Sequence, residues 1–579
     1  MKFIPKLSAE VFRGRLATTN ALPQLSLLGL IIGLITALVI LLFRYVVESG
    51  ATLILGMENE EAYEQLSLYV RVACCIGGAV LLAALLNRYS PSARRVGVVH
   101  VMERLSRHQG YLPLKNAVIQ FFGGAIALIS GQSGGREGPA IHLGATVASL
   151  LGQQFNLPNN SIRTMVACGT ASAIAASFNT PIAGVIFAME VVMMEYTIAS
   201  FIPIIVASVS ATLASQLFFG NAPAFNVAPV AMTSVLEIPY LVLGGLFIGA
   251  VAAGYNQLIQ RFAKLVNYPF WLRILLAGLL TAATASVLPG VMGVGYDTVN
   301  QIMVEEISIL LLIALLFGKA LTSAASVGLG MPVGLIGPTM VLGACLGGIF
   351  GNLLLQIQDA PISVGLYVML GMGAMMAAVL QAPLAALMAV MEMTANTNLI
   401  LPAMVIIVTA TLVSSHVFGQ GSVFIATLNT LGLQYPPSPT SLHLQRVGAT
   451  AIMDRSFVRL PGRISNQKAQ EIVASPLHWI LVDAPEGNGI RAALNPADLS
   501  AFLQERGAEE EVIDLLELPG QRMDVATVDD TATANEVASA LSKSGAGVCC
   551  VTRTTAPMIK PVIGIVTQSH LDNYRNLSS

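Results

Sequence analysis

Residues 134–145, with the sequence GGREGPAIHLGA, decide how this chain is interpreted. Arg136 and Glu137 stand side by side where an apolar helix is expected to begin. An ionisable side chain at membrane depth is costly and is commonly functional. The neighbouring glycines leave backbone N–H groups uncovered, and a helix start directs several of them toward one point that attracts anions. Because a tethered carboxylate can occupy the same amides as a free anion, the motif predicts an anion site gated by Glu137.

The same skeleton occurs a second time in the chain. Residues 334–344, GLIGPTMVLGA, repeat the Gly-x-x-Gly-Pro and Leu-Gly-Ala pattern, and residues 371–392 match residues 169–190 without a gap. Duplicated halves with broken apolar helices are typical of transporters whose site lies between the repeats, near the bilayer midplane. We therefore expect two halves of opposite orientation, at about 68–220 and 270–420, that meet at the two Gly-Pro segments.

Composition indicates an integral membrane protein. Of the 579 residues, 55% are hydrophobic and 11% are charged, and the mean hydropathy is +0.72. Soluble domains carry about 25% charged residues. Residues 164–190 form one of the longer apolar runs, whereas several others are shorter than the roughly 20 residues that cross a bilayer and are expected to be broken helices. The sequence has no basic run that predicts nucleic-acid binding, and its cysteines lack metal-ligand spacing.

Charge placement predicts the domains and their orientation. The segment 1–24 and the loop at 88–115 are rich in lysine and arginine, whereas the loop between the first two apolar runs is acidic. Cationic loops stay in the cytoplasm. We therefore expect a multi-pass protein of the inner cell membrane with both termini in the cytoplasm. Residues 25–433 form the expected membrane domain, 434–445 a proline-rich linker, and 446–579 a soluble tail.

The tail carries alternating strand and helix signals that predict two small α/β units in tandem. Expected strands are 478–482, 490–494, 547–551 and 562–566, and expected helices are 496–504 and 533–544. The predicted fold class is thus an all-α polytopic membrane domain with an inverted internal repeat, followed by a cytoplasmic α/β tail.

The motif at 135–139 and the duplicated Gly-Pro helix starts resemble the CLC family of chloride channels and proton-coupled chloride transporters, over about residues 25–435. The resemblance implies a homodimer with one anion pathway in each subunit. It also implies that Glu137 is the gating glutamate, whose carboxylate moves between the anion path and the outer solution. The residues implied to bind anions through backbone amides are Arg136, Glu137, Gly138, Leu335 and Ile336.

Three departures from the family pattern bear on mechanism. Val96 stands where the resemblance places an anion-coordinating serine, and Phe424 stands where it places a tyrosine. Val191 occupies the inner proton-transfer position, where proton-coupled members often carry glutamate, and valine cannot titrate. Each lost hydrogen bond to the anion is worth about 0.5–1.5 kcal/mol or more, and weaker binding favours fast passage. We therefore expect a passive chloride channel gated by Glu137, with a chloride/proton antiporter that bypasses Val191 as the alternative.

Other interpretations remain beside this one. The alternatives from other classes are a cation transporter and a membrane enzyme regulated by the tail. Catalysis would need a nucleophile–base or metal cluster, and none is evident in the apolar region, so we expect no enzyme activity and no metal. His100 and His142 could relay protons or could be packing residues. Glu190 and Glu392 hold equivalent repeat positions near helix ends, where satisfying backbone groups is the simpler role.

The tail resembles a pair of CBS modules, a common C-terminal attachment in the CLC family. CBS pairs can bind adenine nucleotides, often through a Ser/Thr-x-x-Asp turn. Here residues 495–498, NPAD, lack the hydroxyl, and residues 567–570, TQSH, lack the carboxylate. Nucleotide binding and a purely structural, dimerising role both stay open, and no cofactor is expected to be required.

Overall fold

The computed structural model describes residues 15–18, 21–57, 61–225, 230–232, 234–304, 307–357, 363–433, 439–484, 489–506, 511–554 and 560–577. Residues 1–14 and 19–20 of the expected N-terminal segment and 434–438 of the expected linker lie outside this set. The chain divides into two compact units. A helical unit comprises Leu25–Gln154 and Ile162–Pro436, and a tail unit comprises Met1–Gln24, Phe155–Ser161 and Pro437–Ser579.

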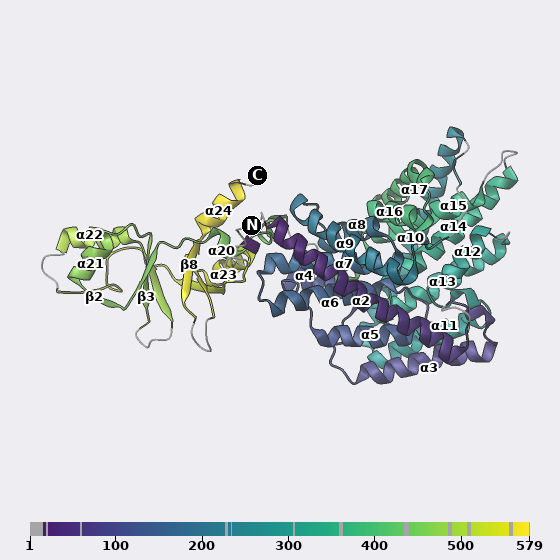
Figure 1. Ribbon diagram of the computed structural model, residues 1–579, viewed down its shortest axis with the longest axis horizontal. Coiled ribbons are helices and arrows are strands. Elements are labelled where there is room, and N and C mark those ends of the chain that lie inside the picture. The colour runs from purple at the N-terminus through teal and green to yellow at the C-terminus, as the bar shows by residue number, and fades with distance from the viewer. Residues whose placement is uncertain are drawn as a thin grey trace, which may run out of the picture. The chain divides into compact units, whose positions relative to one another are not determined.

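The helical unit is built almost entirely from helices (Figure 1). Among the described residues, seven helices are long and apolar enough to cross a membrane. The helices of the first half, with α2 before it and α10 after it, are α2 (Leu22–Leu55), α3 (Leu68–Asn87), α4 (Gly97–Arg107), α5 (Leu114–Ile129), α6 (Glu137–Gln154), α7 (Asn159–Phe178), α8 (Pro181–Phe187), the π-helical turn η2 (Ala188–Met193), α9 (Ile198–Phe219) and α10 (Ile238–Ala263). Those of the second half are α11 (Phe270–Ala285), α12 (Tyr296–Val304), α13 (Ile309–Leu329), α14 (Ile336–Ile357), α15 (Val364–Leu380), α16 (Pro383–Thr394), α17 (Ile400–Leu412), the π-helical turn η7 (Val413–Val417) and α18 (Val423–Thr430).

The apolar run at 164–190 was expected to form one span, and this prediction is wrong, because the helix breaks between α7 and α8. Asn179 has a left-handed backbone, with φ of 56°, and Pro181 opens α8, where its missing N–H costs nothing. The second half breaks in the same way between α15 and α16, where Gln381 has φ of 55° and Pro383 opens α16. The matching breaks confirm that the two halves share one design.

Small residues let the paired helices approach closely in both halves. A Cβ on Gly169 of α7 would lie 2.2 Å from the carbonyl oxygen of Gly144 in α6. In the second half, a Cβ on Gly371 of α15 would lie 2.2 Å from the carbonyl oxygen of Gly343 in α14. These crossings fix α6 against α7 and α14 against α15, and thereby hold the starts of α6 and α14.

The tail unit contains the same three-stranded arrangement twice, as two α/β units in tandem. In each sheet the first pair is parallel and the second is antiparallel, in the orders β1-β3-β4 and β6-β7-β8, and a small antiparallel pair joins β2 to β5. The strands are β1 (Phe457–Leu460), β2 (Arg463–Ser465), β3 (Trp479–Asp483), β4 (Ile490–Leu494), β5 (Val512–Asp514), β6 (Val525–Asp529), β7 (Val548–Thr552) and β8 (Val562–Thr567). The helices are α19 (Pro439–Leu444), α20 (Ala449–Ile452), α21 (Asn466–Val473), α22 (Pro496–Arg506), α23 (Ala534–Ser544) and α24 (Gln568–Leu577).

Strand β7 forms the buried centre of the second sheet, with Cys549 and Cys550 fully covered. Burial raises the pKa of both thiols to about 12. They are therefore neutral at physiological pH and serve as small packing residues.

Candidate functional site

The two Gly-Pro segments lie side by side and antiparallel. The amide of Gly135 donates to the carbonyl of Gly334 at 2.8 Å, and the amide of Gly334 donates to the carbonyl of Gly135 at 2.7 Å. A Cβ on Gly138 would lie 2.9 Å from the Gly334 backbone, so only glycine permits this approach. The starts of α6 and α14 therefore meet at one place, as the repeated motif predicts.

The carboxylate of Glu137 reaches across this junction to the start of α14. Its Oε1 accepts hydrogen bonds from the amide of Ile336 and, at 3.4 Å, from that of Gly337. The side chain is 1% exposed, and among the described residues its Oε2 has no hydrogen-bond partner. Glycine at 135 and 334 leaves the room that this carboxylate fills, since a Cβ at either would lie within 2.3 Å of a carboxylate oxygen. Glu137 thus occupies amides at a helix start, a kind of position that also suits anions.

A cavity of about 460 Å³, here called the central cavity, opens directly onto this carboxylate. Its wall combines segments that are far apart in the sequence: the start of α4, the starts of α6 and α14, and α18. The residues predicted from the sequence that line it are Val96, Glu137, Gly138, Leu335, Ile336 and Phe424. Their assignment as an anion path stays a prediction. Gly337, which the sequence reasoning omitted, contributes the second amide to Glu137 because it follows Ile336 in the first turn of α14.

The central cavity carries more positive than negative charge. Arg94, Arg95 and Arg273 line it, against the acids Glu103 and Glu137. Arg95 pairs with Glu103, with 2.5 Å between guanidinium nitrogen and carboxylate oxygen.

Arg94 and Arg273 flank one aromatic ring in the cavity wall. Their guanidinium carbons lie 4.9 and 5.1 Å from the ring centre of Phe270. A positively charged wall raises the local concentration of anions.

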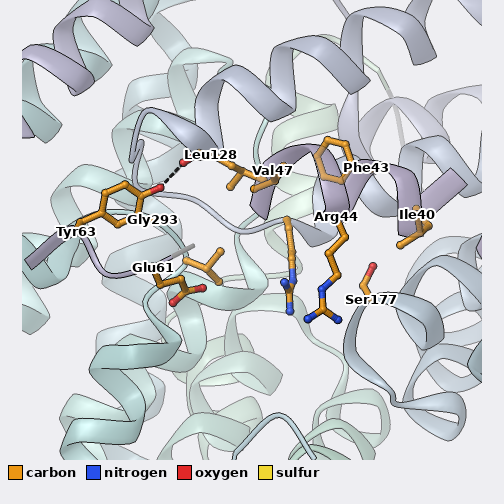
Figure 2. A pocket seen from close by; sticks show the side chains of 11 residues that line it. Ile40, Phe43, Arg44, Val47, Glu61, Tyr63, Leu128, Ser177 and Gly293 are labelled. Carbon is orange, nitrogen blue, oxygen red and sulfur yellow. Dashed lines mark hydrogen bonds between the residues drawn. The ribbon is translucent and has the colours of Figure 1, made fainter. Parts of the chain in front are cut away.

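The side chain of Arg136 leads to a different, smaller cavity, which it lines together with Arg44, Glu61 and Ser177. Figure 2 shows Arg44 and Glu61 directed toward this space. The Arg136 guanidinium lies 5.3 and 5.7 Å from the ring centres of Phe178 and Tyr296. Arg136 is therefore next to Glu137 in the chain, but its side chain lines the smaller cavity and not the central cavity.

Val191 is buried within η2 and is not part of the central-cavity wall. Its neighbour Glu190 accepts hydrogen bonds from the amides of Leu384 and Ala385, at 3.3 and 2.7 Å, at the start of α16. Glu392 does the same for Ile182 and Ala183, at 2.9 and 2.7 Å, at the start of α8. Each half therefore caps a short helix of the other half, which matches the structural role considered for these acids.

The Glu190→Ala protein is expected to be less stable than wild type, because two backbone amides at the start of α16 would lose a charged acceptor. The expected loss is about 2–3 kcal/mol, and Glu190→Gln should lose less because its amide oxygen still accepts. Thermal unfolding in detergent measures the stability of both variants, and Glu505→Ala, at an exposed residue of the tail, is the control. Unchanged stability together with lost transport would instead place Glu190 in the transport path.

Comparisons with known proteins identify the family. The family model described as "Voltage gated chloride channel" matches residues 78–415, more than half of the chain. A "Putative chloride channel protein ClcB-like" of Ralstonia nicotianae is 32% identical over 378 residues, covering 62% of this chain and 87% of that protein. An "H(+)/Cl(-) exchange transporter ClcA" of Vibrio vulnificus is 28% identical over 333 residues, covering 55% of this chain and 71% of that protein.

Solved structures share the fold. A slow cyanobacterial Cl−/H+ antiporter has a TM-score of 0.61 at 21% identity and covers 71% of this chain and 98% of its own. A eukaryotic CLC transporter has a TM-score of 0.60 at 18% identity and covers 94% of this chain and 97% of its own. The duplicated helix starts, the glutamate between them and the family match lead to one conclusion: this chain belongs to the voltage gated chloride channel (CLC) family of anion-transporting membrane proteins.

Proposed function

We propose that this protein transports chloride or chemically similar small anions, with the carboxylate of Glu137 as the gate. The observation that supports this most directly is that Glu137 accepts hydrogen bonds from the amides of Ile336 and Gly337 at the start of α14. An ionised carboxylate competes for those amides, and a protonated or displaced one leaves them to the transported anion. Electropositive walls and bare amides favour anions over cations.

The mode of transport is proposed separately. Val96 and Phe424 present hydrocarbon to the central cavity, and Val191 cannot titrate, which favours passive permeation. Proton-coupled exchange is the second candidate, supported by relatives named H(+)/Cl(-) exchange transporters. The ionisable side chain of His100 in the same cavity wall also supports it.

The test is an ion-substitution experiment on the purified full chain in liposomes. We expect a chloride gradient to set the reversal potential, bromide and nitrate to carry flux, and potassium or sodium to carry none. Flux carried by cations alone, or no halide flux from correctly folded protein, would contradict the proposal. A pH-sensitive dye in the same vesicles separates the two modes, since only exchange moves protons against their gradient.

We further propose a homodimer in the inner cell membrane with both termini in the cytoplasm, and a CBS-like tail that accepts an adenine nucleotide or only dimerises. Support comes from the charge asymmetry of the loops and from the tandem topology of the tail. Asn495 and His570, in the two candidate nucleotide turns, instead bond to nearby backbone: Asn495 Oδ1 accepts from the Ala497 amide, and His570 Nδ1 from that of Thr567. Relatives named as channels and transporters support a protein without enzyme activity.

A further inference from the structure

Two histidines from different helices form a buried pair beside the central cavity. Nδ1 of His100 in α4 lies 2.9 Å from Nε2 of His142 in α6, and the rings stack with centres 5.1 Å apart. His142 is completely buried, and among the described residues its Nδ1 has no hydrogen-bond partner. A hydrogen bond between two imidazoles shares one hydrogen, whichever nitrogen carries it. The pair can therefore take up one extra proton and keep that hydrogen bond.

The pair is connected to the gate by the central cavity. His100 and Glu137 both line this space of about 460 Å³, which is large enough to hold bridging water. His142 lies five residues beyond Glu137 on α6, roughly 7.5 Å along the helix axis. A proton on His100 can thus reach the carboxylate through water.

The pair also occupies the neighbourhood in which the acid at position 191 is missing. Helix α4 packs against η2, which carries Val191, and against α6 and α18. Helix α18 contributes no titratable side chain. The charged and titratable groups on or beside these elements are Arg95, Glu103, Arg104, Arg107, His108, Glu137, Arg163 and Glu190. Glu103 is already paired with Arg95, and Glu190 bonds to the start of α16, so His100 is the group that faces the cavity with exchange capacity.

We propose that His100, with His142 hydrogen-bonded behind it, carries protons between the solution in the central cavity and Glu137. Protonated His100 transfers its proton through water to the Glu137 carboxylate, which gives neutral imidazole and a neutral carboxyl group. The neutral carboxyl group then yields the Ile336 and Gly337 amides to an anion. His142 is a positioning residue, since it accepts or donates the hydrogen bond that orients His100. This inference rests on the Glu137 gate proposed above and adopts the second of the two modes given there, proton-coupled exchange.

The experiment follows chloride and protons together in liposomes that contain the full chain. Wild type is expected to move protons uphill when a chloride gradient is imposed. His100→Gln should reduce proton movement at least about a hundredfold, the lower end of what a positioned acid–base group contributes. Its chloride flux should persist, because Glu137 still exchanges protons with the opposite solution, and that flux also shows that the variant is folded.

Two further variants test the roles of the pair. His142→Gln should lower proton movement less than His100→Gln, because it removes the orienting partner and not the proton carrier. The matched control is His108→Gln, at an exposed histidine at the end of the same helix, which should behave as wild type.

The possible failures are distinguishable. Absence of anion flux in wild type would overturn the proposed function itself. Anion flux without proton movement in wild type would overturn only this inference, as would undiminished proton movement in His100→Gln. A full proton flux in His142→Gln would remove the positioning role, and an equal loss in His108→Gln would show that the effect is not specific to the pair.

Discussion

The Glu137→Ala protein is expected to pass anions at a rate that no longer depends on pH. Protons act on the flux by neutralising the Glu137 carboxylate, which competes for the amides of Ile336 and Gly337. Hydrogen bonds to a charged acceptor are worth about 1.5–3 kcal/mol each, and about 1.4 kcal/mol corresponds to a tenfold change in occupancy. At a pH at which wild type is closed, we therefore expect at least about tenfold faster chloride efflux from the variant.

Chloride efflux from liposomes between about pH 4.5 and 7.5 measures this effect, a range that extends upward from the ordinary pKa of a glutamate. Glu190→Gln is the matched control, because it neutralises another acid of the helical unit that bonds to backbone at the start of α16. The control should keep the pH dependence of wild type. A steep pH dependence that persists in Glu137→Ala would reject the gate assignment.

The Gly371→Ala protein is expected to lose much of its stability. The added Cβ would lie 2.2 Å from the carbonyl oxygen of Gly343, and backbone cannot rotate away as a flexible side chain can. The helices α14 and α15 would have to separate, and overpacking of this kind costs about 1–3 kcal/mol, occasionally more. The equivalent contact in the first half predicts the same result for Gly169→Ala, whose Cβ would lie 2.2 Å from the oxygen of Gly144.

Thermal unfolding and size-exclusion profiles in detergent measure this loss. Gly254→Ala is the matched control, since Gly254 lies within α10 and an added Cβ there would meet no atom within 4 Å. The control should unfold at or above the wild-type temperature, because alanine favours a helix over glycine by about 1 kcal/mol. An unchanged unfolding temperature for Gly371→Ala would show that the helices do not pack as described.

The sequence predicted the class of fold because its signals are local. Apolar runs longer than a bilayer predict spans, and the repeated Gly-Pro skeleton predicts two related halves, as the matching breaks at Asn179 and Gln381 confirm. Strand and helix periodicity in the tail predicted strands and helices that the structure contains within a few residues. The run at 164–190 was misjudged as a single span, because hydropathy carries no information on the left-handed backbone at Asn179 or on the new helix that begins at Pro181.

The site shows the limit of sequence reasoning. The motif identified Glu137 and the segment at 334–338 without indicating that the carboxylate would reach the amides of Ile336 and Gly337. It also gave no sign that Glu190 and Glu392 cap helices of opposite halves. These contacts join residues about 200 positions apart, and local periodicity carries no information on such pairs.

By itself, the sequence determined that this chain lies in a membrane, is duplicated, and offers bare amides at two helix starts, one of which also carries a carboxylate. Only the tertiary structure decided that the two helix starts meet and that the Glu137 carboxylate accepts hydrogen bonds from amides of the other half. It also decided that two histidines pair beside the same cavity. The physical reason is that composition and periodicity act on each residue and its near neighbours along the chain. The direction of a side chain across a glycine-lined contact is decided only when distant helices pack together.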